Sequence, residues 1–298
     1  MTVISRRAAL AAFAGSVVAG CSRVQLLAAN VPAAFGPYHR IVDVRYGSAP
    51  QHALDIYLPE PPSAAAVAPA TSATSAIGRP LVLFWHGGRW EYGDKSQYRF
   101  AGAALASLGV VAVLPNYRHY PQVKMAGFME DAAHAVHWAM THCGEFGADP
   151  KQIFLMGHSA GAHLAALVTL DTRYLAPRVQ VAGLIGLSGP YDFLPLEERD
   201  LQDMFGPPEL YAQSQPIHFV RSDAPRTLLV HGLRDTTVRP RNSSNLAAAL
   251  TTLGVPVTLR LYPELQHGDT LAALSVLARS RAPVLREVAN FIGQPARA

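Results

Sequence analysis

Short apolar runs alternate with stretches of helical periodicity along most of the chain. Continuous runs such as 81–85 and 153–156 have the composition of strands that are buried on both faces. Between the runs, apolar residues recur with the spacing of one helix face, as they do from Met125 to His142. The expected strands are 40–46, 52–58, 81–85, 109–114, 153–156, 181–187, 227–230 and 257–262, and the expected helices are 100–107, 125–142, 160–170, 246–250 and 284–291.

This alternation predicts an α/β fold with a central, mostly parallel sheet of about eight strands and helices on both faces. The chain has 298 residues, 50% of them hydrophobic, which is enough for one large core. Residues 39–298 are therefore expected to form a single domain. Two segments depart from the alternation. Residues 61–80 are rich in Ala, Pro, Ser and Thr and predict a flexible surface loop, and residues 194–222 carry prolines and short helical pieces that predict a small lid.

Charge and cysteine usage exclude several classes of protein. Charged residues make up only 15% of the chain, which argues against disorder. The net charge of +4 comes without any run of Lys or Arg, so no nucleic-acid partner is expected. Neither Cys21 nor Cys143 lies in a CxxC motif or a His-rich cluster, so no metal site is expected.

Residues 1–20 have the pattern of an export signal. Ser5-Arg6-Arg7 resembles a twin-arginine signal, and the apolar stretch that follows is too short for a stable membrane span. Val-Ala-Gly-Cys at 18–21 resembles a bacterial lipobox, in which Cys21 becomes lipidated. We therefore expect an exported protein of the bacterial cell envelope, held on a membrane surface through Cys21, with 21–38 as a tether. The alternative is an ordinary cleaved signal, a periplasmic protein and no role for Cys21.

The pentapeptide at 157–161 reads Gly-His-Ser-Ala-Gly and fits the pattern G-x-S-x-G. A buried strand precedes it and a helix follows it, which is the context in which such a turn exposes a nucleophilic serine. Ser159 is therefore the predicted nucleophile. His158 adjoins it but points away in such a turn, and we expect it to pack or to line the substrate pocket.

A second glycine-containing loop follows the strand 81–85. Residues 86–90 read His-Gly-Gly-Arg-Trp, and the backbone N–H groups of Gly87 and Gly88, together with that of Ala160, can form an oxyanion hole. His86 is expected to brace this loop. Trp90 and Tyr92 are candidate pocket residues.

The acid and the base should follow the serine in the chain, each just after a strand. Asp235 follows the strand 227–230, and His267 follows the strand 257–262, which places both at the same sheet edge as Ser159. His267 would take and return the serine proton, and Asp235 would fix its tautomer.

Other acidic and histidine residues compete for these roles. Asp192, Asp269 and Glu264 are the alternative acids. Among the remaining histidines, His231 is expected to brace the acid loop, and those on the helix 125–142 are expected to be exposed, namely His134, His137 and His142.

Taken together, these motifs resemble the esterase/lipase side of the α/β-hydrolase superfamily. The nearer likeness is to its HGG-W group, which includes kynurenine formamidases, isoprenylcysteine methylesterases and feruloyl or acetylxylan esterase-like proteins. Arg89 stands where hormone-sensitive-lipase relatives usually carry a third glycine, which favours the HGG-W group. The matching pieces are 53–57, 86–90, 116–118, 157–161, 188–192, 231–235 and 267–268.

The resemblance implies a serine carboxylester hydrolase that cleaves small esters through an acyl-enzyme at Ser159, without metal or organic cofactor. Two alternatives stay open. One is an arylformamidase or amidase that uses the same triad. The other is a non-catalytic surface lipoprotein with a hydrolase fold, because function depends on a site and not on a fold.

Overall fold

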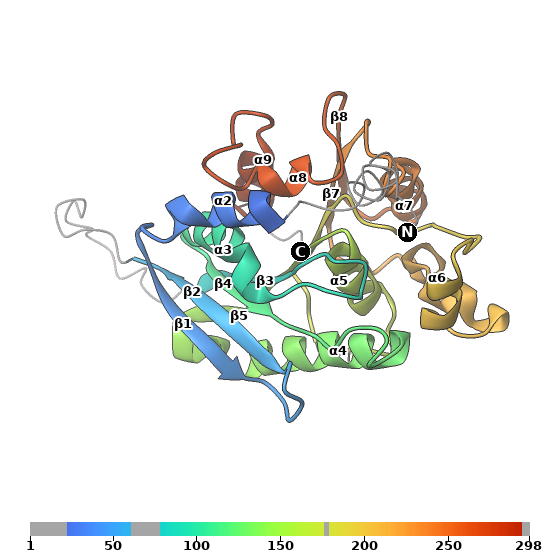
Figure 1. Cartoon of the computed structure of the whole chain (residues 1–298), viewed down its shortest axis with the longest axis horizontal. Helices are drawn as coiled ribbons and strands as arrows, with labels where there is room; N and C mark the ends of the chain where they lie inside the picture. Colours follow the sequence, from blue (N-terminus) through green and yellow to red (C-terminus); the bar gives the residue numbers. More distant parts are fainter. Residues whose placement is uncertain (1–22, 61–77, 176–178, 294–298) are drawn as a thin grey trace, which may run out of the picture.

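Eight strands form one sheet in the computed structural model, which describes residues 23–60, 78–175 and 179–293. Neighbouring strands follow the order β1-β2-β4-β3-β5-β6-β7-β8 (Figure 1). Strands β3 to β8 are parallel to one another, and β2 runs antiparallel to both β1 and β4. The predicted mostly parallel sheet is confirmed. The strands are β1 (Tyr38–Arg45), β2 (Ala53–Pro59), β3 (Arg79–Trp85), β4 (Val111–Pro115), β5 (Ala148–His158), β6 (Gly183–Leu187), β7 (Thr227–Gly232) and β8 (Val257–Tyr262).

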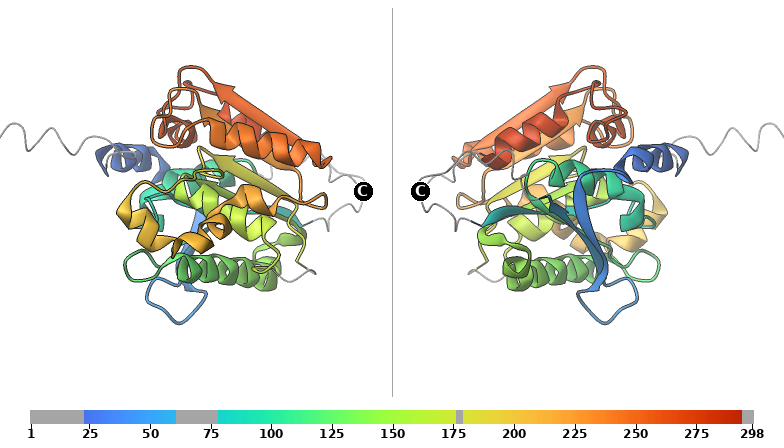
Figure 2. Two further views of the ribbon diagram at one scale, coloured as in Figure 1. Left: turned by 90° about the vertical axis from the view of Figure 1, so that its right-hand side faces the viewer. Right: turned by 90° about the vertical axis from the view of Figure 1, so that its left-hand side faces the viewer.

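Helices cover both faces of the sheet because successive strand residues point to opposite sides. In β3, Leu81 and Leu83 join a core with α4, α5 and α7, whereas Val82 and Phe84 join a core with α2, α3, α8 and α9. Figures 1 and 2 show α4 and α9 on opposite sides of the sheet. The helices are α2 (Arg23–Ala33), α3 (Arg99–Ala106), α4 (Met125–His142), α5 (Ala160–Leu170), α6 (Arg199–Met204), α7 (Arg241–Thr252), α8 (Asp269–Ala272) and α9 (Val284–Gly293), with short 3-10 turns η2 (Lys95–Tyr98), η3 (Cys143–Phe146), η4 (Pro208–Ser214) and η5 (Pro216–Phe219).

Strands β3 and β5 begin earlier than their apolar runs predict. Strand β5 starts at Ala148 because this residue pairs with Arg79, beyond a register shift in the ladder between β3 and β5. Because β3 begins at Arg79, the last two residues of the predicted loop 61–80 belong to a strand. Gly78 precedes the strand, and the rest of that loop, 61–77, lies outside the described residues.

The N-terminal segment differs from the predicted tether, because residues 23–33 form helix α2, which packs on α3. Leu26 is buried in the core shared with α3. The side-chain amide oxygen of Asn30 accepts a hydrogen bond from the N–H of Phe100 (2.9 Å), and its amide nitrogen donates to the carbonyl of Gln97 (2.9 Å). Asn30 therefore satisfies backbone groups at the start of α3, and these contacts explain why the segment is docked on the domain.

The predicted export signal 1–20 and the predicted lipidation at Cys21 lie outside the described residues and stay predictions. Within the ranges that the structure describes, no helix has both the length and the apolar character needed to cross a bilayer.

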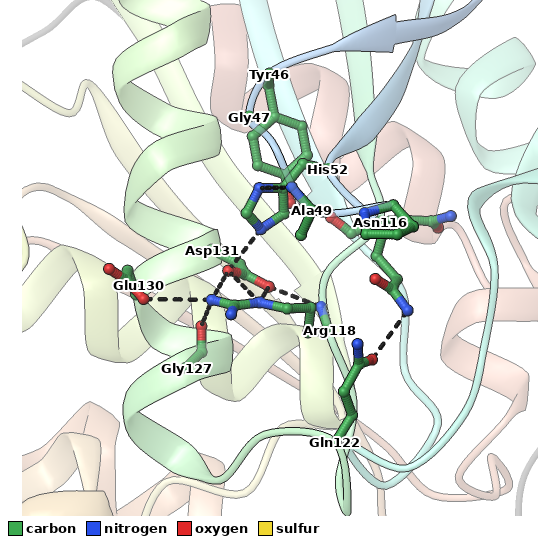
Figure 3. Close-up of polar contacts among 12 residues, drawn as sticks. Tyr46, Gly47, Ala49, His52, Asn116, Arg118, Gln122, Gly127, Glu130 and Asp131 are labelled. Carbon is green, nitrogen blue, oxygen red and sulfur yellow. Dashed lines mark hydrogen bonds and ion pairs between the residues drawn. The ribbon is translucent and has the colours of Figure 1, made fainter.

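A buried ionic cluster joins the first hairpin to helix α4 (Figure 3). The carboxylate of Asp131 is fully buried and contacts His52 Nε2 at 2.8 Å. It also accepts hydrogen bonds from the backbone N–H of Arg118 (2.7 Å) and from its guanidinium (2.5–3.0 Å). Burial alone would raise the pKa of Asp131, but the hydrogen bonds from Arg118 and His52 outweigh burial and hold that pKa below its usual range.

Replacing Asp131 with asparagine should lower the free energy of unfolding by about 3 kcal/mol, because the variant leaves the Arg118 guanidinium without its buried partner. The folded state lowers the pKa of Asp131, so its stabilisation is complete above the ordinary carboxyl pKa and is lost as pH falls through the lowered value. The difference between wild type and variant should therefore shrink in acid. Urea unfolding at neutral and at acidic pH measures both effects.

The matched control is Asp203→Asn, which removes an exposed ion pair with Lys124 (2.6 Å). Exposed pairs contribute little to stability, so this variant should unfold at nearly the wild-type urea concentration. An equal loss of stability in the two variants would contradict the role assigned to Asp131.

Candidate active site

Ser159 is the single residue between a strand and the helix that follows it. Strand β5 ends at His158 and α5 begins at Ala160, and Ser159 adopts φ 54° and ψ −123°, a conformation that is strained for an L-residue. Its N–H donates to the carbonyl of Leu187 at 2.9 Å, which anchors the turn to β6.

The glycines on either side of this turn are required by close backbone contacts. A Cβ on Gly157 would lie 2.2 Å from the carbonyl of Gly161, and a Cβ on Gly161 would lie 2.1 Å from the carbonyl oxygen of Trp85. No side chain fits at those distances. This explains the G-x-S-x-G pattern in this chain by local packing alone.

Ser159, His267 and Asp235 form a continuous hydrogen-bonded chain. The Oγ of Ser159 lies 2.9 Å from His267 Nε2, and His267 Nδ1 lies 2.8 Å from Asp235 Oδ2. Asp235 follows β7 and His267 follows β8, so the parallel strands bring the three residues to one sheet edge. Because the carboxylate only accepts, Nδ1 carries the proton, and Nε2 is left free to accept the proton of Ser159.

The side chain of Asp235 is fully buried, and its carboxylate has three further contacts. Its Oδ1 accepts from the N–H groups of Thr237 (2.9 Å) and Val238 (2.8 Å), and its Oδ2 lies 3.1 Å from His231 Nε2. Burial alone would raise its pKa, but the hydrogen bonds from His231 and His267 hold the pKa of Asp235 well below the usual carboxyl range. His231 also contacts the Oγ of Ser243 through Nδ1 (2.7 Å), which fits its predicted bracing role.

The alternative acids are engaged elsewhere. Asp192 accepts from Asn245 at 2.6 Å, Glu264 pairs with Arg234 at 2.5 Å, and Asp269 pairs with Arg281. Of the four acids weighed from the sequence, Asp235 is the one that the structure joins to His267.

The glycine loop after β3 passes directly beside the nucleophile. A Cβ on Gly87 would lie 3.1 Å from the Cβ of Ser159, and Gly88 has a φ of +125°, which favours glycine. Within the described residues, no backbone carbonyl accepts a hydrogen bond from the N–H of Gly87, Gly88 or Ala160. Ala160 is also the first residue of helix α5, where N–H groups lack helical partners and the dipole favours negative charge. These three groups can therefore hold an oxyanion.

Two histidines fix the surroundings of this loop. His86 is buried, its Nδ1 lies 2.7 Å from the carbonyl of Gly87, and its ring stacks on Tyr117 (4.8 Å between ring centroids). His158 Nε2 donates to the carbonyl of His267 (3.0 Å), and burial lowers the pKa of His158 to about 3, so this ring is neutral. His158 therefore supports the backbone of the base, and it also lines the cavity described next.

A cavity of about 840 Å³ opens over Ser159 and His267. The candidate pocket residues Trp90 and Tyr92 line it. Trp90 is buried and Tyr92 is 49% exposed. The predicted lid segment 194–222 contains α6, η4 and η5, and it contributes lining residues that include Leu196 and Leu201. Leu26, from the segment predicted as a tether, also lines the cavity.

Sequence reasoning missed His163, which orients Trp90. The Nε1 of Trp90 donates to His163 Nδ1 (3.3 Å), and His163 Nε2 donates to the carbonyl of Ser214 (2.7 Å). Burial lowers the pKa of His163 to about 4, which keeps the ring neutral and able to accept from Trp90. Its position, four residues after Ser159 on α5, is the one sequence signal that could have found it.

Among the described residues, no group of three or more His, Cys, Asp or Glu side chains is arranged to hold a metal ion.

The sheet, the strained serine turn and the hydrogen-bonded chain are features of serine hydrolases with the α/β-hydrolase fold. The chain belongs to the BD-FAE family, whose model matches residues 54–250. The resemblance to esterase-type α/β-hydrolases is thereby confirmed.

Known proteins similar to this chain include esterases and a kynurenine formamidase of Salmo salar, which is 26% identical over 261 residues, covering 85% of this chain and 83% of that protein. A probable isoprenylcysteine alpha-carbonyl methylesterase of Arabidopsis thaliana is 28% identical over 261 residues, which cover 79% of this chain and 52% of that protein. Esterase LipQ of Mycobacterium tuberculosis is 27% identical over 292 residues, which cover 89% of this chain and 65% of LipQ. The chain thus spans about half the length of the methylesterase and under two thirds of LipQ. The butyrate-bound structure of the thermophilic esterase Est2 of Thermogutta terrifontis matches with a TM-score of 0.67 and 25% identity, covering 85% of this chain and 92% of Est2.

Proposed function

We propose that this protein is a serine carboxylesterase that cleaves small esters through an acyl-enzyme at Ser159. One observation carries the proposal: Ser159, His267 and Asp235 form an unbroken hydrogen-bonded chain that begins at the floor of a cavity. The esterase names of the relatives support the same reaction class.

In the first half of the reaction, the Oγ of Ser159 attacks the ester carbonyl carbon and its proton passes to His267 Nε2. The carbonyl oxygen becomes an oxyanion, which the N–H groups of Gly87, Gly88 and Ala160 stabilise. The carboxylate of Asp235 stabilises the imidazolium that has formed. The tetrahedral intermediate then collapses, the bond to the alcohol oxygen breaks, and the alcohol leaves with the proton from His267.

In the second half of the reaction, the same residues activate a water molecule that hydrolyses the acyl-enzyme. His267 Nε2 takes a proton from a water molecule as the water oxygen attacks the acyl carbon on Ser159. The oxyanion forms again in the same place. Collapse breaks the bond to Ser159 Oγ, which recovers its proton from His267, and the carboxylic acid is released.

The dimensions of the site support small substrates. Trp90, Phe193 and Leu196 line the cavity of about 840 Å³ and present apolar surface to an acyl or alcohol group. Est2, one of the structural matches, has a structure with bound butyrate, a carboxylate with a short chain. We therefore propose esters with short acyl chains as substrates.

Hydrolysis of p-nitrophenyl esters, from acetate to long acyl chains, tests this proposal, with formanilide as a parallel amide substrate. We expect turnover of the short esters and a decline as the chain outgrows the cavity. Cleavage of formanilide without cleavage of any ester would instead identify an amidase or formamidase. A folded protein that cleaves neither would be a non-catalytic member of the fold.

A further inference from the structure

The rim of the cavity carries a polar segment that the reaction described above does not use. This rim segment, residues 236–241, directly follows the catalytic acid and contributes Thr236, Thr237, Arg239 and Arg241 to the cavity lining. All four side chains are exposed to solvent. These residues carry two hydroxyl groups and two guanidinium groups, and all four are both exposed and part of the cavity lining.

The backbone of the rim segment is fixed to the catalytic acid. The N–H groups of Thr237 and Val238 both donate to Oδ1 of Asp235. The carbonyl of Val238 accepts from His231 Nε2 (2.9 Å), and the carbonyl of Arg239 accepts from both the backbone N–H and the side chain of Asn242 (3.0 Å each). The backbone of the rim segment is therefore held at a fixed position relative to Asp235. A ligand that binds to this segment would pay a smaller entropic cost than one that binds to a mobile loop.

The two guanidinium groups lack acidic partners within the described chain. Among residues 23–60, 78–175 and 179–293, no carboxylate lies within 4.0 Å of the guanidinium of Arg239 or Arg241. Arg89, the third arginine of the cavity, instead pairs with Glu91 (3.4 Å) and Glu198 (2.9 Å). Because Arg89 neutralises Glu198, Glu197 is the one negative charge lining the cavity that has no ion-pair partner among the described residues. The charge of the lining is thus positive, and it is concentrated on the rim segment.

We infer that the rim segment is a subsite for a carboxylate, and that the preferred substrates are esters that carry a carboxylate a few atoms from the bond to be cleaved. This inference rests on the proposed esterase function. The planar fork of a guanidinium matches the two oxygens of a carboxylate, and the threonine hydroxyls supply further donors. A bound carboxylate would place the ester over Ser159 while the apolar side of the cavity holds the rest of the substrate.

Paired substrates that differ by one carboxylate test the inference. Mono-p-nitrophenyl adipate and p-nitrophenyl hexanoate differ at the end of the acyl chain, and 4-acetoxybenzoate and its methyl ester differ on the alcohol side. In wild type, kcat/KM should favour the anionic member of at least one pair by about tenfold, the size expected for hydrogen bonds between charged groups. Added salt should weaken the preference, because the rim is exposed.

The double variant Arg239→Gln/Arg241→Gln should lower the anionic-to-neutral ratio of kcat/KM to about one. Taking the ratio within each variant removes any difference in the amount of folded protein. The matched control is Arg234→Gln, an exposed arginine near the rim segment that pairs with Glu264 and does not line the cavity, and its ratio should equal that of wild type.

Two results would overturn the inference while leaving the proposed function intact: equal kcat/KM within both pairs in wild type, or an anionic preference that survives in the double variant. If wild type cleaves none of the four esters, the proposed esterase function fails and the carboxylate subsite fails with it.

Discussion

Replacing Ser159 with alanine should reduce the kcat for p-nitrophenyl butyrate by roughly 10⁶-fold, the scale seen when a triad serine is removed from another serine hydrolase. Without Oγ, His267 has no proton to take and no acyl-enzyme forms. Alanine at position 159 would have the same strained backbone conformation as serine (φ 54°), so we expect the variant to fold as the wild type does. Initial rates, together with thermal unfolding of each protein, measure the effect.

Ser188 provides the matched control for this variant. Ser188 is buried and, like Ser159, has a positive φ (49°). It follows β6 at the same sheet edge, and its Oγ contacts the hydroxyl of Thr270 at 2.9 Å. Ser188→Ala should keep most of the turnover. A fluorophosphonate probe should label wild type and Ser188→Ala but not Ser159→Ala, and substantial turnover by Ser159→Ala would rule out the acyl-enzyme mechanism.

The Asp235→Asn variant should lose about 10⁴-fold in kcat, the effect known for this change in a triad. An asparagine amide can donate to His267 Nδ1, which favours the tautomer with the proton on Nε2, and that nitrogen then cannot accept from Ser159. Since the pKa of Asp235 is held well below the usual carboxyl range, wild type retains the ionised carboxylate in mildly acidic solution. We therefore expect the variant to be impaired throughout the pH range in which wild type is active.

The Asp235→Asn substitution should also change how the free energy of unfolding depends on pH. A carboxylate with a lowered pKa stabilises the folded state above its ordinary pKa, and this contribution is lost as pH falls through the lowered value. Asp235→Asn should therefore be less stable than wild type at neutral pH, with a smaller difference in acid. The control is Asp192→Asn, which changes another acid weighed from the sequence, and it should retain wild-type turnover. Equal losses of turnover in the two variants would contradict the assignment of Asp235.

Much of the fold follows from local patterns. Strands buried on both faces appear in the sequence as continuous apolar runs, so β3 and β5 to β7 were predictable. The proximity of Ser159, Asp235 and His267 was also predictable, because each lies just after a strand and parallel strands end at one edge. The turn at Ser159 also requires glycine at positions 157 and 161, because a Cβ there would collide with backbone atoms, and this requirement is visible in the sequence.

The features that escaped prediction depend on contacts between distant segments. Helix α2 buries little of its own surface, so its sequence has no clear apolar face, and its docking depends on Asn30 meeting the start of α3. His163 acquires its role only when Trp90 and Ser214 meet it. The ionic cluster at Asp131 likewise joins residues separated by 79 positions in sequence, from His52 to Asp131. Spacing along one element cannot reveal such pairings.

The position of Leu26 has a practical consequence for anyone who engineers this protein. A shortened version that began at β1, at the boundary the composition favours, would remove a residue that lines the cavity and the side chain of Asn30 that meets the start of α3. We expect such a truncation to alter substrate selectivity and to expose the surface of α3 that helix α2 covers. Fusion partners and purification tags at the N-terminus are therefore best joined ahead of Arg23, so that helix α2 is kept whole.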